Sequence, residues 1–119
     1  MSIFATDRVG TTLHTALDGL SMRQRVIADN IANVNTPGFR ASTVQFESSL
    51  RAALADGTLT PDTTVAATTP ANTPVGANGN NVDLGSETMS AMQSVFQYQL
   101  MSRAATDRYT LISTAAGSF

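Results

Sequence analysis

The chain has 119 residues, which allows at most one domain and is too short to bury a large core unaided. Its formal net charge is −2, and Asp and Glu outnumber Lys and Arg by nine to seven, which argues against a nucleic-acid-binding protein. The absence of cysteine excludes disulfides, thiol catalysis and thiolate metal sites, and no apolar run reaches the roughly 18 residues of a transmembrane segment.

The N-terminal region is expected to form a long amphipathic helix. Residues 1–8 lack a basic region followed by an apolar one, so we expect no cleaved secretory signal. Thr6 or Asp7 could cap the helix, which continues to about Val34. Apolar residues that recur every four and three positions predict a coiled-coil-like seam along one face: Leu13, Leu17, Leu20, Ile27, Ile31 and Val34.

A proline and a glycine end this helix. The residue before a proline is pushed out of the helical region, so Pro37 stops the periodic pattern. Pro37 and Gly38 stand in the order that a type II turn takes at its two central positions. Phe39 follows as an apolar anchor.

Residues 28–40 read Ala-Asp-Asn-Ile-Ala-Asn-Val-Asn-Thr-Pro-Gly-Phe-Arg. This stretch closely resembles the N-terminal signature of the axial proteins of the bacterial flagellum, the rod and hook family. The resemblance implies a structural subunit of a filament, not an enzyme, that needs no cofactor. The signature positions are Asn30, Ile31, Ala32, Asn33, Thr36, Pro37, Gly38 and Phe39.

The middle of the chain predicts a short helix and then a loop. Phe46, Leu50 and Leu54 recur every four residues, which predicts a helix over Ser42–Leu54 that ends near Gly57. Residues 58–81 are dominated by Thr, Ala, Pro, Asn and Gly and cannot bury enough apolar surface to offset their ordering entropy. We expect a flexible surface loop there, mobile unless a neighbour orders it, and no strand anywhere.

A second long helix is predicted for the C-terminal region. Asp83 is a plausible N-cap, and Glu87 favours the positive end of the helix dipole. The apolar repeat of four and three residues continues to the end of the chain and predicts the second half of the seam at Val95, Tyr98, Tyr109 and Ile112.

The fold class expected from these elements is all-α. The N-terminal and C-terminal helices pair antiparallel as a coiled-coil-like hairpin, with a short third helix and a flexible middle. Residues 1–57 and 82–119 together form one domain, and residues 58–81 form the loop between them. Four large apolar residues fall outside the seam and predict an outward interface with neighbouring subunits: Met22, Phe96, Leu100 and Leu111.

The C-terminal region sharpens the resemblance. Asn80-Asn81-Val82-Asp83-Leu84, followed by Glu87 and Tyr98-Gln99, resembles the proximal-rod branch of the family, B type. The resemblance implies export through the flagellar export apparatus without a cleaved signal, and a place in the basal-body rod within the periplasm. The partners that it implies are copies of the chain, other rod proteins, and the membrane (MS) ring with its adaptor, in a drive shaft that transmits torque.

Two other functions remain open. One is a C-type rod protein of the same family, and the other is a secreted helical binding module. An enzyme has no supporting constellation, because the single histidine, His14, has no Ser, Asp or Glu at a spacing that suggests a site.

Two groups of asparagines have alternative interpretations. Residues 78–83 lack the order of an EF-hand calcium loop, so a turn that leads to a helix cap is favoured. Asn30, Asn33 and Asn35 could form local hydrogen bonds at the helix end or hydrogen bonds between subunits, and the sequence weighs these equally.

Overall fold

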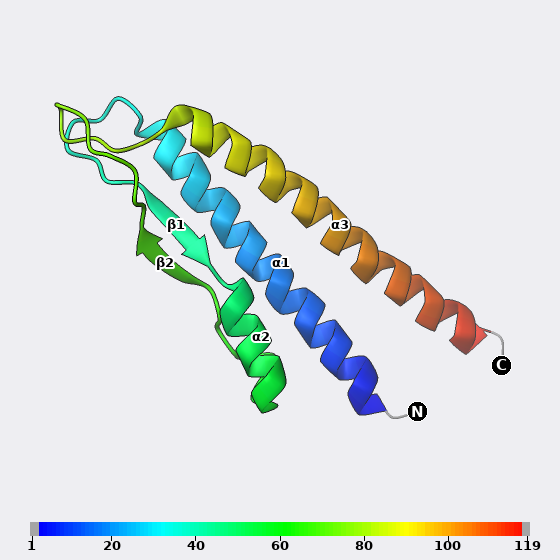
Figure 1. Ribbon diagram of the computed structural model, residues 1–119. Helices are drawn as coiled ribbons and strands as arrows, with labels where there is room; N and C mark the ends of the chain where they lie inside the picture. Colours follow the sequence, from blue (N-terminus) through cyan, green and yellow to red (C-terminus); the bar gives the residue numbers. More distant parts are fainter. Residues whose placement is uncertain (1–2, 118–119) are drawn as a thin grey trace.

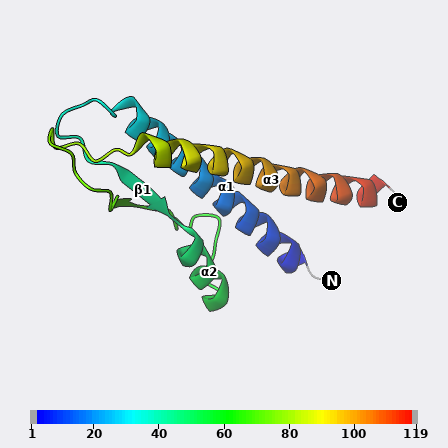
Figure 2. The same ribbon diagram turned by 45° about the horizontal axis from the view of Figure 1, so that its top comes forward.

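The computed structural model describes residues 3–117, with side chains from Arg8 onward, and is mostly helical. The elements in chain order are α1 (Ile3–Ala32), β1 (Ser42–Gln45), α2 (Glu47–Asp56), β2 (Ala67–Pro70) and α3 (Leu84–Gly117). Helix α1 lies in the middle, with α3 along one side and β1, β2 and α2 along the other (Figure 1). Helices α1 and α3 run in opposite directions, and the three helices fan apart toward the end where α1 begins (Figure 2).

Helix α1 begins earlier and ends earlier than expected. It starts at Ile3, so the cap expected at Thr6 or Asp7 is wrong, and it ends at Ala32 rather than near Val34. The last turn tightens because the N–H of Asn33 donates to the carbonyl of Asn30 over 3.1 Å as well as to that of Asp29.

The turn expected at Pro37 and Gly38 is present. The N–H of Phe39 donates to the carbonyl of Thr36 over 3.2 Å, and Gly38 has a φ of 76°. A positive φ at the third position, with proline at the second, is the backbone of a type II turn.

A small antiparallel sheet corrects the all-α expectation. Helix α2 begins at Glu47, not at Ser42, and the preceding residues form β1, which pairs Ser42 with Pro70 and Gln45 with Ala67. Val44 points into the core from β1 and is 3% exposed. The Val44 side chain is buried on one side of the extended backbone while the strand pairs with β2.

The core lies between α1 and the layer made by β1 and α2. Its buried members are Ala16, Leu20, Val44, Phe46, Leu50, Ala53 and Val65. The ring of Phe46 lies directly on Gly19, where an added Cβ would be 2.6 Å from Cγ of the ring. A glycine inside α1 weakens the helix, but here it lets the ring approach the helix backbone.

The segment 58–81, expected to be a flexible loop, supplies both β2 and the buried Val65. The composition of this segment predicts neither the strand nor the buried valine. Both depend on neighbours, because β1 supplies the strand that pairs with β2 and α1 supplies apolar contacts. At its start, Gly57 has a φ of 69° and the N–H of Thr58 donates to the carbonyl of Ala53 over 3.0 Å, so α2 ends where expected.

Helix α3 begins at the expected cap. The N–H of Ser86 donates to Oδ1 of Asp83 over 3.2 Å. Near its other end, a Cβ added at Gly10 of α1 would be 3.1 Å from the guanidinium of Arg108, so α3 follows α1 along most of its length. No helix within residues 3–117 has the length and apolar character needed to cross a membrane.

Candidate assembly site

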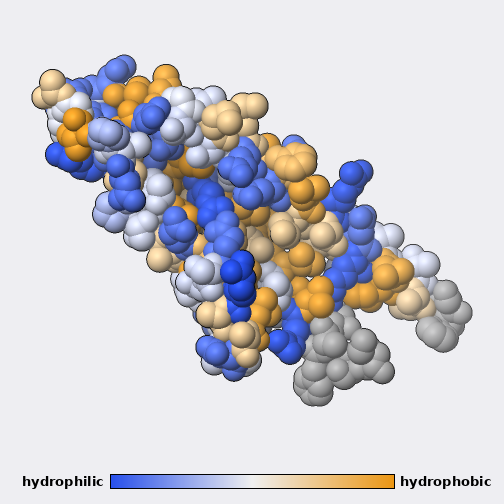
Figure 3. All heavy atoms as spheres, viewed as in Figure 1, coloured by the Kyte–Doolittle hydropathy of each residue, from blue (hydrophilic) through white to orange (hydrophobic). Residues whose placement is uncertain are grey.

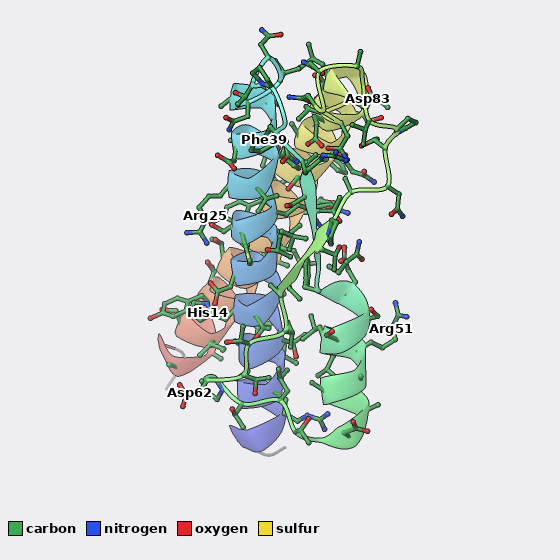
Figure 4. All side chains as sticks on the ribbon, turned by 90° about the vertical axis from the view of Figure 1, so that its left-hand side faces the viewer. His14, Arg25, Phe39, Arg51, Asp62 and Asp83 are labelled. Carbon is green, nitrogen blue, oxygen red and sulfur yellow. The ribbon has the colours of Figure 1, made fainter. Side chains whose placement is uncertain are left out.

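The two segments that resemble the flagellar family meet where α1 ends and α3 begins. Asn80, which is 8% exposed, donates from Nδ2 to the carbonyls of Asn33 and Thr36 over 2.9 and 2.8 Å. Both carbonyls follow the end of α1 and also accept from the N–H groups of Thr36 and Phe39, so Asn80 adds a second hydrogen bond to each and ties the C-terminal segment to the N-terminal one. Figure 4 shows both segments at one end of the molecule, beside Phe39 and Asp83.

Backbone contacts join the same two segments more closely. The N–H of Gly38 donates to the carbonyl of Asn78 over 2.9 Å, and Oδ1 of Asn81 accepts from the N–H of Ala41 over 2.6 Å. Gly79 has a φ of 80°, and an added Cβ would lie 3.2 Å from Cα of Gly38. The absence of a side chain at Gly79 therefore lets two backbones touch, and residues 78–83 form the expected turn and cap.

Asn30 has a role that neither interpretation of the asparagines included. It is 1% exposed, and its Nδ2 donates to the carbonyl of Ser42 over 2.8 Å and to Oε1 of Glu87 over 3.1 Å. Its Oδ1 accepts from the N–H of Ser42 over 3.2 Å. One side chain thus connects α1, β1 and α3 within a single subunit. Asn33 does bond locally, because its Nδ2 donates to the carbonyl of Asp29 over 2.8 Å.

An ion pair holds α2 against α1. The guanidinium of Arg23 donates to both carboxylate oxygens of Glu47, over 2.8 and 2.6 Å, and to the carbonyl of Val44 over 2.8 Å. It also lies 4.7 Å from the centroid of the Phe46 ring. These hydrogen bonds from Arg23 lower the pKa of Glu47, although partial burial of the carboxylate opposes the shift.

The face of α3 toward α1 is polar and small. Its only fully buried residues among those described are Glu87 and Ser94, and the Ser94 hydroxyl has no hydrogen-bond partner in the structure. Ala91, Tyr98 and Ala105 on the same side are half-buried. Small residues let the two helices approach, but they contribute little apolar burial.

The seam residues of the N-terminal segment are buried or half-buried, whereas most of those on α3 are exposed. The α1 residues lie toward the protein interior, with Leu20 and Ile27 buried and Leu13, Leu17, Ile31 and Val34 half-buried. On α3, Tyr98 packs against the core, whereas Val95, Tyr109 and Ile112 are 47%, 77% and 45% exposed. The apolar repeat of α3 is therefore rotated away from α1.

Three of the four predicted outward residues are exposed, and the fourth is not. Phe96, Leu100 and Leu111 are exposed. Met22 was expected to face outward, and this is wrong, because it is half-buried and packs against the core cluster. The layer of β1 and α2, which the hairpin prediction did not include, covers that side of α1.

Four apolar residues form a continuous strip on α3, which we call the outer stripe: Met89, Met92, Phe96 and Leu100. They are 71%, 67%, 60% and 51% exposed. Their spacing of three and four residues places them on one face, and at about 100° per residue this face points away from Glu87 and Ser94. Among the described residues, every exposed large hydrophobic side chain except Val9 and Val75 lies on α3. Apolar surface along this helix is visible in Figure 3.

The sequence pattern did not predict that Met89 and Met92 lie on the surface or that Glu87 and Ser94 face α1. A helical projection of α3 shows two apolar faces, and only the partner helix decides which one is covered.

Comparisons with known proteins identify relatives. A family described as "Flagella basal body rod protein" matches residues 11–40, which include the signature turn. The flagellar basal body rod protein FlgB of Borreliella burgdorferi is 35% identical over 74% of this chain and 80% of that protein. FlgB of Bacillus subtilis is 29% identical over 96% of this chain and 95% of that protein. FlgB of Borrelia hermsii is 61% identical over 34% of this chain and 30% of that protein.

Proposed function

Because the chain belongs to the flagellar basal body rod proteins and is a structural subunit of the bacterial flagellar rod, we propose that its α1 and α3 act as a coiled-coil-like hairpin whose outer stripe binds neighbouring subunits. The relatives are B-type rod proteins, which favours this type over the C type and over a secreted binding module. The proposal assigns no catalytic site and no cofactor to the chain.

The outer stripe is the observation that carries this proposal. Four large apolar side chains, each more than half exposed, stand on the side of α3 opposite α1. Full burial of such a side chain contributes about 1.5 to 3 kcal/mol, so covering what is exposed adds roughly 1 to 2 kcal/mol for each. Exposed apolar strips of this kind mark interfaces.

The junction between the signature turn and residues 78–83 supports a mechanical role. Its hydrogen bonds and its two glycines fix the angle at which α3 leaves α1, so each subunit presents its outer stripe in a defined direction. A tube built from such subunits resists twisting, because a torque must break many buried contacts at once. In this way the rod transmits torque across the periplasm.

The remaining partners and the place of assembly follow from the family. We assign contacts with copies of the chain, other rod proteins, the MS ring and its adaptor, and passage through the flagellar export apparatus without a cleaved signal. In the assembled rod, Val95, Tyr109 and Ile112 form the second half of the seam against a neighbour, because α1 of the same subunit leaves them exposed.

The test is complementation of a bacterium that lacks its B-type rod gene. The Phe96→Glu variant places a charge in the outer stripe, where it cannot be buried without a large penalty. We expect normal amounts of chain but no rods and no swimming. Ser49→Glu, a matched change at an exposed position of α2, should swim normally. A Phe96→Glu strain that swims like the unmodified one contradicts the proposal.

A further inference from the structure

An apolar groove lies open along α1 beside α2, and α3 lines one of its two sections. One section has a volume of about 310 Å³ and the next about 380 Å³, and Leu54 of α2 lines both. We call these two sections together the α1 groove, and its apolar lining, besides Phe46 of the core, is Val9, Leu13, Leu20, Leu50, Leu54 and Met101.

The α1 groove and the outer stripe match in length. The groove floor extends along α1 from Val9 to Leu20, and the outer stripe extends along α3 from Met89 to Leu100. Both spans cover the same number of residues, about 16 Å at 1.5 Å per residue. An amphipathic helix that lays its apolar face into an apolar groove is a common mode of recognition. Because the stripe faces away from α1, it cannot reach the groove of its own subunit.

Charges at one end of each surface are complementary. Arg8 lines the groove beside Val9, and Asp56 lies two residues beyond Leu54 at the same end of α2. Past Leu100 the face of the outer stripe continues with Arg103 and Asp107. A neighbouring α3 that is placed with its Leu100 end toward Val9 therefore brings Arg103 and Asp107 close to Asp56 and Arg8. Each charge can then meet one of opposite sign.

We propose that the outer stripe of a second copy of this chain docks in the α1 groove, with Met89 toward Leu20 and Leu100 toward Val9. This contact rests on the proposed role as a rod subunit and identifies which surfaces meet. It is heterologous, because two different surfaces of the same chain meet, and such contacts generate rings or open helical arrays rather than two-fold dimers.

The size of the contact sets how stable it is alone. Four side chains that are more than half exposed offer on the order of 500 Å², and the groove offers less because Leu20 and Leu50 are already buried, so the contact falls below the roughly 1,000 Å² of a specific interface. Two copies in solution should therefore associate only transiently. The contact becomes stable where each subunit makes it twice, once through its stripe and once through its groove.

Cysteine cross-linking tests the contact, because the chain has no cysteine of its own. Purified full-length Leu54→Cys and Phe96→Cys chains are mixed at high concentration and oxidised. A disulfide requires the two Cα atoms to approach within about 7 Å. We expect at least ten times more mixed dimer than from Thr68→Cys with Phe96→Cys, since Thr68 is an exposed residue of β2. Equal yields, or a dominant dimer of Phe96→Cys with itself, would overturn the proposal.

Charge substitutions in the complementation strain separate this proposal from the role as a rod subunit. Phe96→Glu and Leu54→Lys should each abolish swimming, and the double variant should regain it, because the two charges attract across the contact. If Phe96→Glu stops swimming and Leu54→Lys does not, the groove proposal fails while the rod role stands. Rescue also excludes misfolding of Leu54→Lys as the cause. If both single variants swim, the stripe does not hold the rod.

Cross-linking in the complementation strain identifies the protein that occupies the groove. In cells that carry Leu54→Cys and Phe96→Cys in one chain, oxidation should give a ladder of cross-linked copies of this chain. Cross-links from Leu54→Cys only to a different rod protein would overturn a second copy as the occupant.

Discussion

The side chains of Asn30 and Glu87 meet inside the subunit, where Nδ2 of Asn30 donates to Oε1 of Glu87 over 3.1 Å. They belong to α1 and α3 and are 1% and 9% exposed. Because a carboxylate that is buried without a donor is strongly unfavourable, this bond defines how the first turns of α3 lie against the end of α1.

Replacing Asn30 with alanine should therefore be severe. The Asn30→Ala variant leaves the Glu87 carboxylate and both backbone groups of Ser42 without these partners, and we expect a loss of about 2 to 4 kcal/mol. At roughly 4 to 8 °C per kcal/mol for a small domain, the melting temperature by circular dichroism should fall by about 8 °C or more. Asn35→Ala, at an exposed position, should melt like the unmodified chain. Equal melting of both variants would show that the buried bond is unimportant.

Gly19 should not tolerate even a methyl group. In Gly19→Ala the new Cβ would lie 2.6 Å from the Phe46 ring, so the ring or the helix must move. Overpacking of this kind costs about 1 to 3 kcal/mol, which should outweigh a helix-propensity gain of about 1 kcal/mol.

Gly10→Ala is the matched control in the same helix. Its Cβ would meet only the flexible end of Arg108, at 3.1 Å, so the helix-propensity gain should remain. We expect the thermal midpoint to fall for Gly19→Ala and to stay equal or rise for Gly10→Ala. The reverse order would contradict the packing described for Phe46.

Which parts of this fold could be predicted depends on where each element finds its partner. The apolar repeat of three and four residues along α1 and α3 and the Pro37-Gly38 pair are local sequence signals. The two long helices and the turn were therefore predictable. Strand β1 has only four residues, and all four residues of β2 are exposed, so neither carries a periodic signal. Their pairing is set by contacts between distant segments, which local composition does not reveal.

The two glycines of the junction should differ in sensitivity. Gly38→Ala introduces only the strain of a side chain at positive φ, because nothing lies within 4 Å of its Cβ. That strain costs about 1 to 2 kcal/mol. Gly79→Ala adds to this strain a contact of 3.2 Å with the backbone of Gly38. We expect Gly79→Ala to lower the melting temperature more than Gly38→Ala, and the opposite ranking would contradict the close approach of the two turns.

The ion pair of Arg23 and Glu47 should make stability depend on pH. Hydrogen bonds from Arg23 lower the pKa of Glu47 in the folded chain. The ion pair therefore contributes fully to folding stability above pH 4.5, the ordinary pKa of Glu, and this contribution is lost as the pH falls through the lowered pKa of the folded chain. Glu47 is 49% exposed, so the contribution is at most about 1 kcal/mol. The melting temperature of Glu47→Gln should lie slightly below that of the unmodified chain at pH 7, and the difference should shrink as the pH falls below 4.5. A constant difference across this range would exclude the ion pair as its source.

The candidate interface was predictable in kind but not in position. The apolar repeat of α3 indicated a seam with α1, yet the buried residues that face α1 are Glu87 and Ser94, which carry no apolar signal. Periodicity finds the face of a helix that is apolar, and in a subunit built for assembly that face can belong to a neighbour. Phe96 and Leu100 were predicted as outward residues because they fall outside the seam.

Oxidation of methionines reports which side chains solvent reaches, and it therefore tests whether the outer stripe is an interface in the rod. In the free chain, Met89 and Met92 of the outer stripe should oxidise rapidly, and Met22, packed against the core, should oxidise slowly. In isolated basal bodies we expect Met89 and Met92 to become as protected as Met22. If they oxidise equally fast in the free chain and in the assembled rod, the outer stripe is not an interface and the account is wrong.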